Sequence, residues 1–83
     1  MTPDPSSLAS QPLRTTVRVV AVSGEDDLAR RLGDLGFWPG TEVELVRRAP
    51  LGDPLEVRLR GYRLALRRAE ADRVQVATDG VDG

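Results

Sequence analysis

Residues 55–67 read LEVRLRGYRLALR, two runs of alternating apolar and polar side chains that meet at Gly61. A period of two is typical of strands that bury one face, and a glycine between two such runs indicates a tight hairpin turn. We place Gly61 and Tyr62 at the centre of that turn. Leu59 would then oppose Leu64, which puts the apolar side chains of both runs on one face. The stretch therefore predicts an antiparallel hairpin with one buried face.

Three further strands are predicted on either side of this hairpin. Residues 16–22 are rich in β-branched side chains, which favour extended structure. Residues 42–46 alternate glutamate with apolar side chains, and residues 74–76 place two valines on one face. A single helical turn is expected at residues 69–72, just before the last strand.

The pattern between the first two strands has the period of a helix. Leu28, Leu32 and Leu35 recur at positions i, i+4 and i+7, so they share one face of an amphipathic helix. Ser23 is predicted to cap the start of this helix. Gly36 supplies the left-handed residue that commonly ends one.

These elements predict a mainly β fold, a small and partly open SH3-like barrel of about five strands with one short helix after the first strand. Residues 15–77 carry the barrel. Residues 1–14, rich in Pro, Ser and Thr, are predicted to be a disordered leader, and residues 78–83 a disordered acidic tail.

The composition excludes several kinds of chemistry. The chain of 83 residues has no Cys and no His, and all 12 basic residues are Arg against 13 acidic ones. Disulfides, thiolate or imidazole metal ligands and Ser–His or Cys–His catalysis are therefore impossible. Carboxylates alone are a poor ligand set for transition metals. We expect no enzyme activity, no cofactor and no dedicated metal site.

The sequence also gives an expectation about location. No run approaches the ~20 apolar residues of a membrane span. Residues 1–12 hold no basic group and no apolar stretch, so they do not resemble a secretory signal. A cytoplasmic protein without direct membrane insertion is expected.

Three motifs occur in a fixed order along the chain. They are LGFWPG at residues 35–40, RAPLGDP at residues 48–54 and RGYRLALRRAEA at residues 60–71. In this order and at this spacing they closely resemble the FeoA family, small proteins encoded with the bacterial ferrous iron transporter FeoB. The resemblance spans roughly residues 17–76, which is nearly all of the predicted barrel.

The resemblance implies an SH3-like barrel that supports ferrous iron uptake by binding the cytosolic part of a FeoB-like transporter. Transition metal binding is attached to the family by association. The same domain type ends the DtxR-like metal-dependent repressors, where a DNA-binding domain precedes it. A metal-linked regulatory domain of that repressor type is thus an alternative, although the sequence shows no DNA-binding segment and a stand-alone protein is expected. A small nucleic-acid-binding barrel is a second alternative.

Most of the motif residues are expected to shape the backbone. Glycines and prolines at these positions set turns, and an Asp before Pro is a common turn former. The structural motif residues are Leu35, Gly36, Pro39, Gly40, Pro50, Gly52, Asp53, Pro54 and Gly61.

Five residues are candidates for partner binding. Trp38 is interpreted as an exposed aromatic anchor, with a lid over the barrel end as the alternative. Leu51 lies at the tip of a loop bounded by Pro and Gly, where little core is within reach. Arg58, Arg60 and Arg63 belong to a basic cluster that fits an acidic partner, although ion pairing on a solvated face or nucleic acid binding would explain it too. If both are exposed, Trp38 and Leu51 could also support a weak homo-oligomer.

Overall fold

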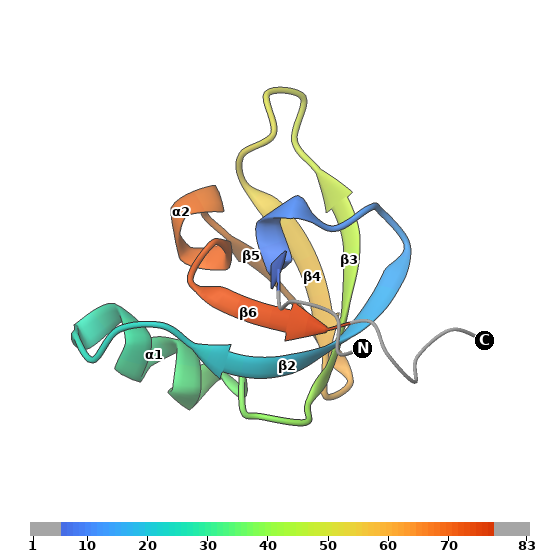
Figure 1. The fold of residues 1–83 in the computed structure, drawn as a ribbon. Helices are drawn as coiled ribbons and strands as arrows, with labels where there is room; N and C mark the ends of the chain where they lie inside the picture. The colour runs from blue at the N-terminus through green and yellow to red at the C-terminus, as the bar shows by residue number, and fades with distance from the viewer. Residues whose placement is uncertain (1–5, 78–83) are drawn as a thin grey trace.

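The computed structural model of the chain describes residues 6–77 as a curled β-sheet with short helices at its ends (Figure 1). The strands are β1 (Ser6–Ser7), β2 (Thr15–Val22), β3 (Glu42–Arg48), β4 (Leu55–Leu59), β5 (Tyr62–Leu66) and β6 (Val74–Ala77). The helices are the 3-10 helix η1 (Leu8–Ser10), α1 (Asp27–Leu35) and α2 (Arg68–Ala71). The predicted mainly β architecture is confirmed, with β1 as a sixth strand that the sequence pattern did not indicate.

All six strands belong to one antiparallel sheet in the order β1-β6-β2-β3-β4-β5. The sheet curls so that its inner face encloses the core, and α1 lies against one end of β2 (Figure 1). The strands place their alternating apolar side chains on that inner face, as the period of two predicts. The buried strand residues are Val17, Val19, Val43, Leu45, Leu55, Val57, Leu59, Leu66, Val74 and Val76.

The predicted disordered leader is wrong for residues 6–14. Leu8 and Ala9 of η1 are buried, and β1 pairs with β6. The Arg48 guanidinium donates hydrogen bonds to the carbonyl oxygens of Ala9 at 2.9 Å and Gln11 at 2.7 Å. Because these bonds satisfy the backbone, a segment with few apolar residues can still seat Leu8 in the core. Residues 1–5 and the predicted tail at 78–83 lie outside the described residues.

The prediction for the start of α1 is wrong, and the prediction for its end is confirmed. Asp26, not Ser23, is the N-cap residue, and its carboxylate accepts the Ala29 N–H. Gly36 has a φ of 110° and ends the helix as predicted. The Phe37 N–H then donates to the Leu32 carbonyl oxygen at 3.2 Å, which completes the turn.

The hairpin between β4 and β5 forms, but its register differs from the prediction by two residues. Arg60, with a φ of 50°, and Gly61, with a φ of 84°, form the turn. Leu59 therefore pairs with Tyr62 instead of Leu64. A two-residue turn with positive φ at both central positions matches the twist of the strands, and Arg60 adopts that conformation although it is not glycine. A shift of two residues keeps the parity, so the predicted buried face is correct.

Neither α1 nor α2 has the length and apolar character needed to cross a bilayer, and the same holds for every helix within residues 6–77.

Candidate functional site

A tight turn after α1 brings Trp38 to the surface. The Thr41 N–H donates to the Trp38 carbonyl oxygen at 2.9 Å, and Gly40 has a φ of 91°. Pro39 and Gly40 thus occupy the central positions that a type II turn prefers for them. The Pro39 and Gly40 motif, which the sequence predicts to set a turn, therefore also orients the large side chain of Trp38.

The Trp38 side chain is 49% exposed and is nevertheless held in place. Its indole N–H donates to the Gly33 carbonyl oxygen at 2.7 Å. The guanidinium carbon of Arg60 lies 4.5 Å from the ring centroid, a cation–π geometry. An exposed aromatic ring that is already ordered loses little conformational entropy on binding, which is the property of a good anchor.

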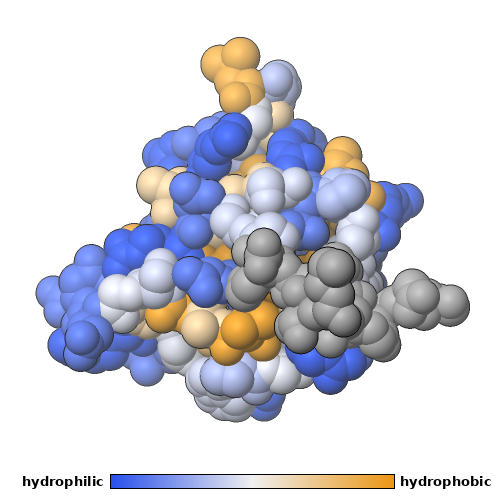
Figure 2. Space-filling view, viewed as in Figure 1, coloured by the Kyte–Doolittle hydropathy of each residue, from blue (hydrophilic) through white to orange (hydrophobic). Residues whose placement is uncertain are grey.

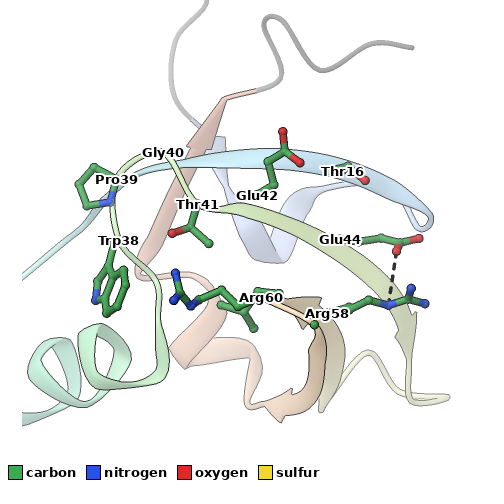
Figure 3. A pocket seen from close by; sticks show the side chains of 11 residues that line it. Thr16, Trp38, Pro39, Gly40, Thr41, Glu42, Glu44, Arg58 and Arg60 are labelled. Atoms are coloured by element: carbon green, nitrogen blue, oxygen red, sulfur yellow. Dashed lines mark ion pairs between the residues drawn. The ribbon is translucent and has the colours of Figure 1, made fainter.

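Gly36 makes room for this contact. A Cβ atom on Gly36 would lie 2.9 Å from Cδ of Arg60. Within residues 6–77, Arg60 forms no ion pair, so its charge remains available to a ligand. Figure 3 shows the Arg60 guanidinium pointing toward Trp38.

An open groove of about 650 Å³ lies between this turn and the β4–β5 hairpin (Figure 3). At one end stand Trp38 and Arg60. At the other end Arg58 forms an ion pair with Glu44 at 3.8 Å. The groove is lined by Thr16, Trp38, Pro39, Gly40, Thr41, Glu42, Glu44, Arg58, Leu59, Arg60 and Gly61.

Arg63 lies outside this groove. It faces Arg58 across the β4–β5 pair and forms an ion pair with Glu56 at 3.2 Å. Arg47 approaches the same glutamate at 3.9 Å. The predicted basic cluster is therefore interleaved with glutamates on the outer face of the sheet, which fits the alternative of a solvated ion-paired face for Arg58 and Arg63 but not for Arg60.

Leu51 projects from the far end of the β3–β4 hairpin and is 94% exposed. Its loop extends away from the rest of the fold in Figure 1, and the space-filling view shows an apolar protrusion there (Figure 2). The loop is fixed at its base because the Asp53 carboxylate accepts the Arg68 N–H at 3.0 Å, at the start of α2. The Gly52 N–H donates to the Ala49 carbonyl oxygen at 2.8 Å and closes a turn around Pro50 and Leu51.

The structure thus divides the five predicted partner residues among three places. Trp38, Arg58 and Arg60 share the groove, Arg63 lies beside it, and Leu51 is at the opposite end of the hairpin. Sequence reasoning missed four polar groove residues. A signal for two of them existed in the alternation of β3, which places Glu42 and Glu44 on its outer face. The missed lining residues are Thr16, Thr41, Glu42 and Glu44.

Several acidic side chains make structural contacts. In the part of the chain that the structure describes, no group of three or more Asp, Glu, His or Cys side chains is arranged to hold a metal ion. Asp53 caps α2 and Glu56 binds Arg63. The residues present do not fit a transition metal site, because imidazole and thiolate ligands are absent from the sequence.

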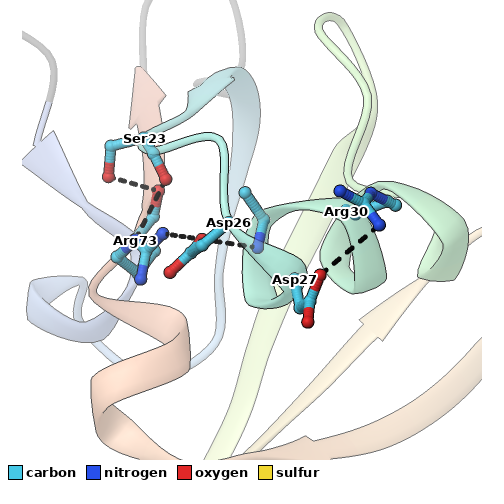
Figure 4. A network of polar contacts seen from close by, with 6 residues as sticks. Ser23, Asp26, Asp27, Arg30 and Arg73 are labelled. Atoms are coloured by element: carbon cyan, nitrogen blue, oxygen red, sulfur yellow. Dashed lines mark hydrogen bonds and ion pairs between the residues drawn. The ribbon is translucent and has the colours of Figure 1, made fainter.

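The neighbours of Asp26 shift the pKa of its carboxyl group below the ordinary value. The Arg73 side chain, through a hydrogen bond to its carboxylate, lowers the pKa of Asp26, and the Ala29 N–H lowers it further. Arg73 also donates to the Ser23 carbonyl oxygen at 3.0 Å. Figure 4 shows these contacts joining the start of α1 to the turn before β6. We call this cluster of Ser23, Asp26 and Arg73 the clasp. It holds the start of α1 to the turn before β6, and none of its residues lines the groove.

The comparison with known protein families decides the identity of the chain. A family model described as the FeoA domain matches residues 7–78. The chain belongs to the FeoA domain family. The match begins at Ser7, so it includes the η1 segment that the sequence analysis had left outside the domain.

Relatives with 30% identity or more agree with this assignment. An FeoA-like protein from Clostridium acetobutylicum is 32% identical with a TM-score of 0.87, over 98% of this chain and 94% of that one. FeoA from Stenotrophomonas maltophilia, crystallised with zinc and described as an SH3 domain protein, is 43% identical with a TM-score of 0.76, over 86% of this chain and 88% of that one. The predicted SH3-like fold is confirmed by this likeness.

A third relative links the family to ferrous iron transport. The chain is 34% identical over 58 residues to a fusion of Fe(2+) transport protein A with the Fe(2+) transporter FeoB from Porphyromonas gingivalis. This match covers 70% of the chain but only 7% of the fusion protein. FeoA is therefore a small domain associated with ferrous iron transport.

The repressor alternative is supported at the level of fold alone. A manganese-dependent transcriptional repressor has a TM-score of 0.82 to 93% of this chain at 19% identity, and the match covers 38% of the repressor. FeoA and that repressor share the barrel, and this likeness says nothing of a shared activity.

Proposed function

We propose that this FeoA chain is a non-enzymatic accessory protein of ferrous iron uptake that acts in the cytoplasm on the cytosolic part of a FeoB-like transporter. The observation that carries the proposal is the Porphyromonas gingivalis protein, in which the two parts form one polypeptide. Domains that are fused in one species commonly act on each other when they are separate chains. The transporter would supply the transport activity, and FeoA a docking surface.

The groove at Trp38 is the docking site in this proposal. Trp38 combines half-exposure with a fixed orientation, and Arg60 beside it has no ion pair among residues 6–77. An aromatic anchor next to an available cation suits a partner surface that offers an apolar pocket and a carboxylate. Leu51 is a separate contact in this proposal, since it lies at the other end of the β3–β4 hairpin.

Titration of FeoA with the purified cytosolic region of the FeoB encoded in the same genome tests the docking site. Trp38→Ala is expected to weaken binding about tenfold or more, as truncation of an interface anchor does. Val20→Ala is the matched control, because Val20 is also exposed, at 40%, but lies on β2 outside the groove. Equal affinities for wild type and Trp38→Ala would reject the groove.

Leu51→Asp tests the second contact separately. A charge at a tip that inserts into an apolar pocket is expected to weaken binding, whereas the exposed position leaves the fold intact. If Leu51→Asp binds like the wild type, the loop tip is not part of the interface.

A further inference from the structure

The outer edge of β5 has no neighbouring strand in the part of the chain that the structure describes. The sheet ends at β5, which pairs only with β4. A free edge presents a row of backbone N–H and C=O groups that can pair with another chain. Arg63 and Ala65 on this strand are both exposed.

The register identifies which backbone groups face outward. Leu59 and Tyr62 flank a two-residue turn, so they form a hydrogen-bonded pair. Because bonded and non-bonded pairs alternate along an antiparallel ladder, Arg63 and Ala65 turn their N–H and C=O groups away from β4. No hydrogen bond from residues 6–77 outside the ladder reaches these groups. The edge therefore offers two donors and two acceptors at the spacing of one added strand.

The inner face of the same edge is incompletely covered. Leu64 points toward the core and is only half-buried, whereas its cross-strand partner Val57 is fully buried. An added strand would place an apolar side chain beside Leu64 and remove it from water. Leu64 therefore keeps part of its apolar surface in contact with water beside an edge that has no strand partner among residues 6–77.

The charges on the outer face select the kind of strand that fits. Arg63, Ala65 and Arg67 alternate onto this face, and all three are exposed. Arg67 forms no ion pair with any side chain in residues 6–77. Arg63 already pairs with Glu56 at 3.2 Å, so Arg67 carries the uncompensated charge of this edge. A second copy of the chain would add a further arginine of the same kind, which is destabilising, whereas an acidic side chain opposite Arg67 would pair with it.

We propose that the β5 edge binds an extended acidic peptide segment as an added antiparallel strand. In that strand, one acidic side chain lies against Arg67, a second lies beside Arg63, which also pairs with Glu56, and an apolar side chain lies against Leu64. Backbone bonds to Arg63 and Ala65 supply the affinity, and the alternating side chains supply the specificity. This inference does not rest on docking at Trp38, because Arg63, Ala65 and Arg67 do not line the groove.

The test is a titration, followed by NMR of the backbone amides, with the probe peptide acetyl-Ser-Glu-Val-Thr-Val-Glu-Ser-amide. The largest shifts are expected at Arg63 and Ala65, and hydrogen exchange of their amides should slow. A peptide with Lys in place of both Glu residues is expected to bind about tenfold more weakly, from lost pairing and added repulsion. Largest shifts at Trp38 or Arg60, or equal binding of the Lys peptide, would overturn the proposal.

Two changes isolate the backbone bonds. Ala65→Pro removes an outward N–H without touching the β4 ladder, a position where an edge strand tolerates proline. It is expected to weaken binding about fivefold to tenfold, the value of one lost hydrogen bond. The same peptide with an N-methyl group on its Thr should lose a similar amount against wild-type protein, so the result does not depend on the variant folding. Unchanged affinity for the methylated peptide, or a wild-type dimer that Ala65→Pro dissolves, would contradict an acidic peptide as the occupant.

Discussion

At the scale of single residues, the candidate site depends on two neighbouring positions, Gly36 and Trp38, and on Arg60, which lies 22 residues after Trp38. Gly36 ends α1 and leaves space beside its Cα, Arg60 passes through that space, and Trp38 receives the guanidinium on its ring. The left-handed conformations of Gly36 and Arg60 are therefore part of the site as well as of the turns. A small change at Gly36 should disturb both.

Gly36→Ala is expected to destabilise the protein by about 1–3 kcal/mol, because alanine is strained at a φ of 110°. Gly33→Ala is the matched control. Gly33 lies within α1 at a helical φ, with nothing within 4 Å of an added Cβ, so the change should stabilise by about 0.5–1 kcal/mol. Urea unfolding of both variants checks the signs, and destabilisation by Gly33→Ala as large as that by Gly36→Ala would contradict the role given to the left-handed turn.

The lowered pKa of Asp26 leads to a second prediction at this scale, on the pH dependence of stability. Since its pKa is lower in the folded than in the unfolded chain, where it is near 3.8, its contribution to stability is present above that value and is lost as the pH falls through the folded pKa. The difference in melting temperature between wild type and Asp26→Asn should therefore be largest near neutral pH and shrink as the pH falls below 3.8. Thermal unfolding across this range measures it. A difference that grows on acidification would contradict the clasp.

At the scale of elements, β1 forms one edge of the sheet beside β6, and η1 packs against β6 and α2. Leu8 reaches the core from this segment, and Arg48 binds its backbone carbonyls. The segment is short and polar, so its stability comes from tertiary contacts and not from its own sequence pattern.

Leu8→Ala is expected to cost about 2–5 kcal/mol, as the removal of a fully buried leucine does. Leu13→Ala is the control, because Leu13 is 45% exposed, and a change within about 0.5 kcal/mol is expected. Urea unfolding of the two variants compares them directly. Equal small effects would show that residues 6–14 are dispensable to the fold.

The same elements show why the sequence predicted some features and missed others. The strands and α1 follow from periods of 2 and 3.6 that bury one face. The start of α1 depends on whether Ser23 or Asp26 caps the helix, and the β4–β5 register depends on whether Arg60 or Tyr62 joins Gly61 in the turn. In both cases the sequence pattern favours the two residues almost equally. The contact between Trp38 and Arg60 joins positions 22 residues apart and exists only once the hairpin turn is fixed. Trp38 as an exposed residue was predictable, whereas its cationic neighbour was not.

At the scale of the whole molecule, the two exposed apolar side chains that are candidates for partner contact lie in different regions. Trp38 lies beside the groove, and Leu51 lies at the tip of the β3–β4 loop. Because these single residues are separated, they do not form the continuous apolar patch that a stable dimer needs. We expect a monomer at micromolar concentration, and light scattering across a concentration series measures it. A dimer that Trp38→Ala or Leu51→Asp dissociates would show instead that these residues bind a second copy.

In the proposed function, FeoA supports ferrous iron uptake by docking on FeoB through the Trp38 groove. The most direct measurement is radioactive ferrous iron uptake in cells that lack this gene, with FeoB quantified in the same membranes. Deletion should reduce uptake at an unchanged FeoB level, and wild-type FeoA and Val20→Ala should restore it, whereas Trp38→Ala should not. Unchanged uptake after deletion, or full restoration by Trp38→Ala, would contradict the account.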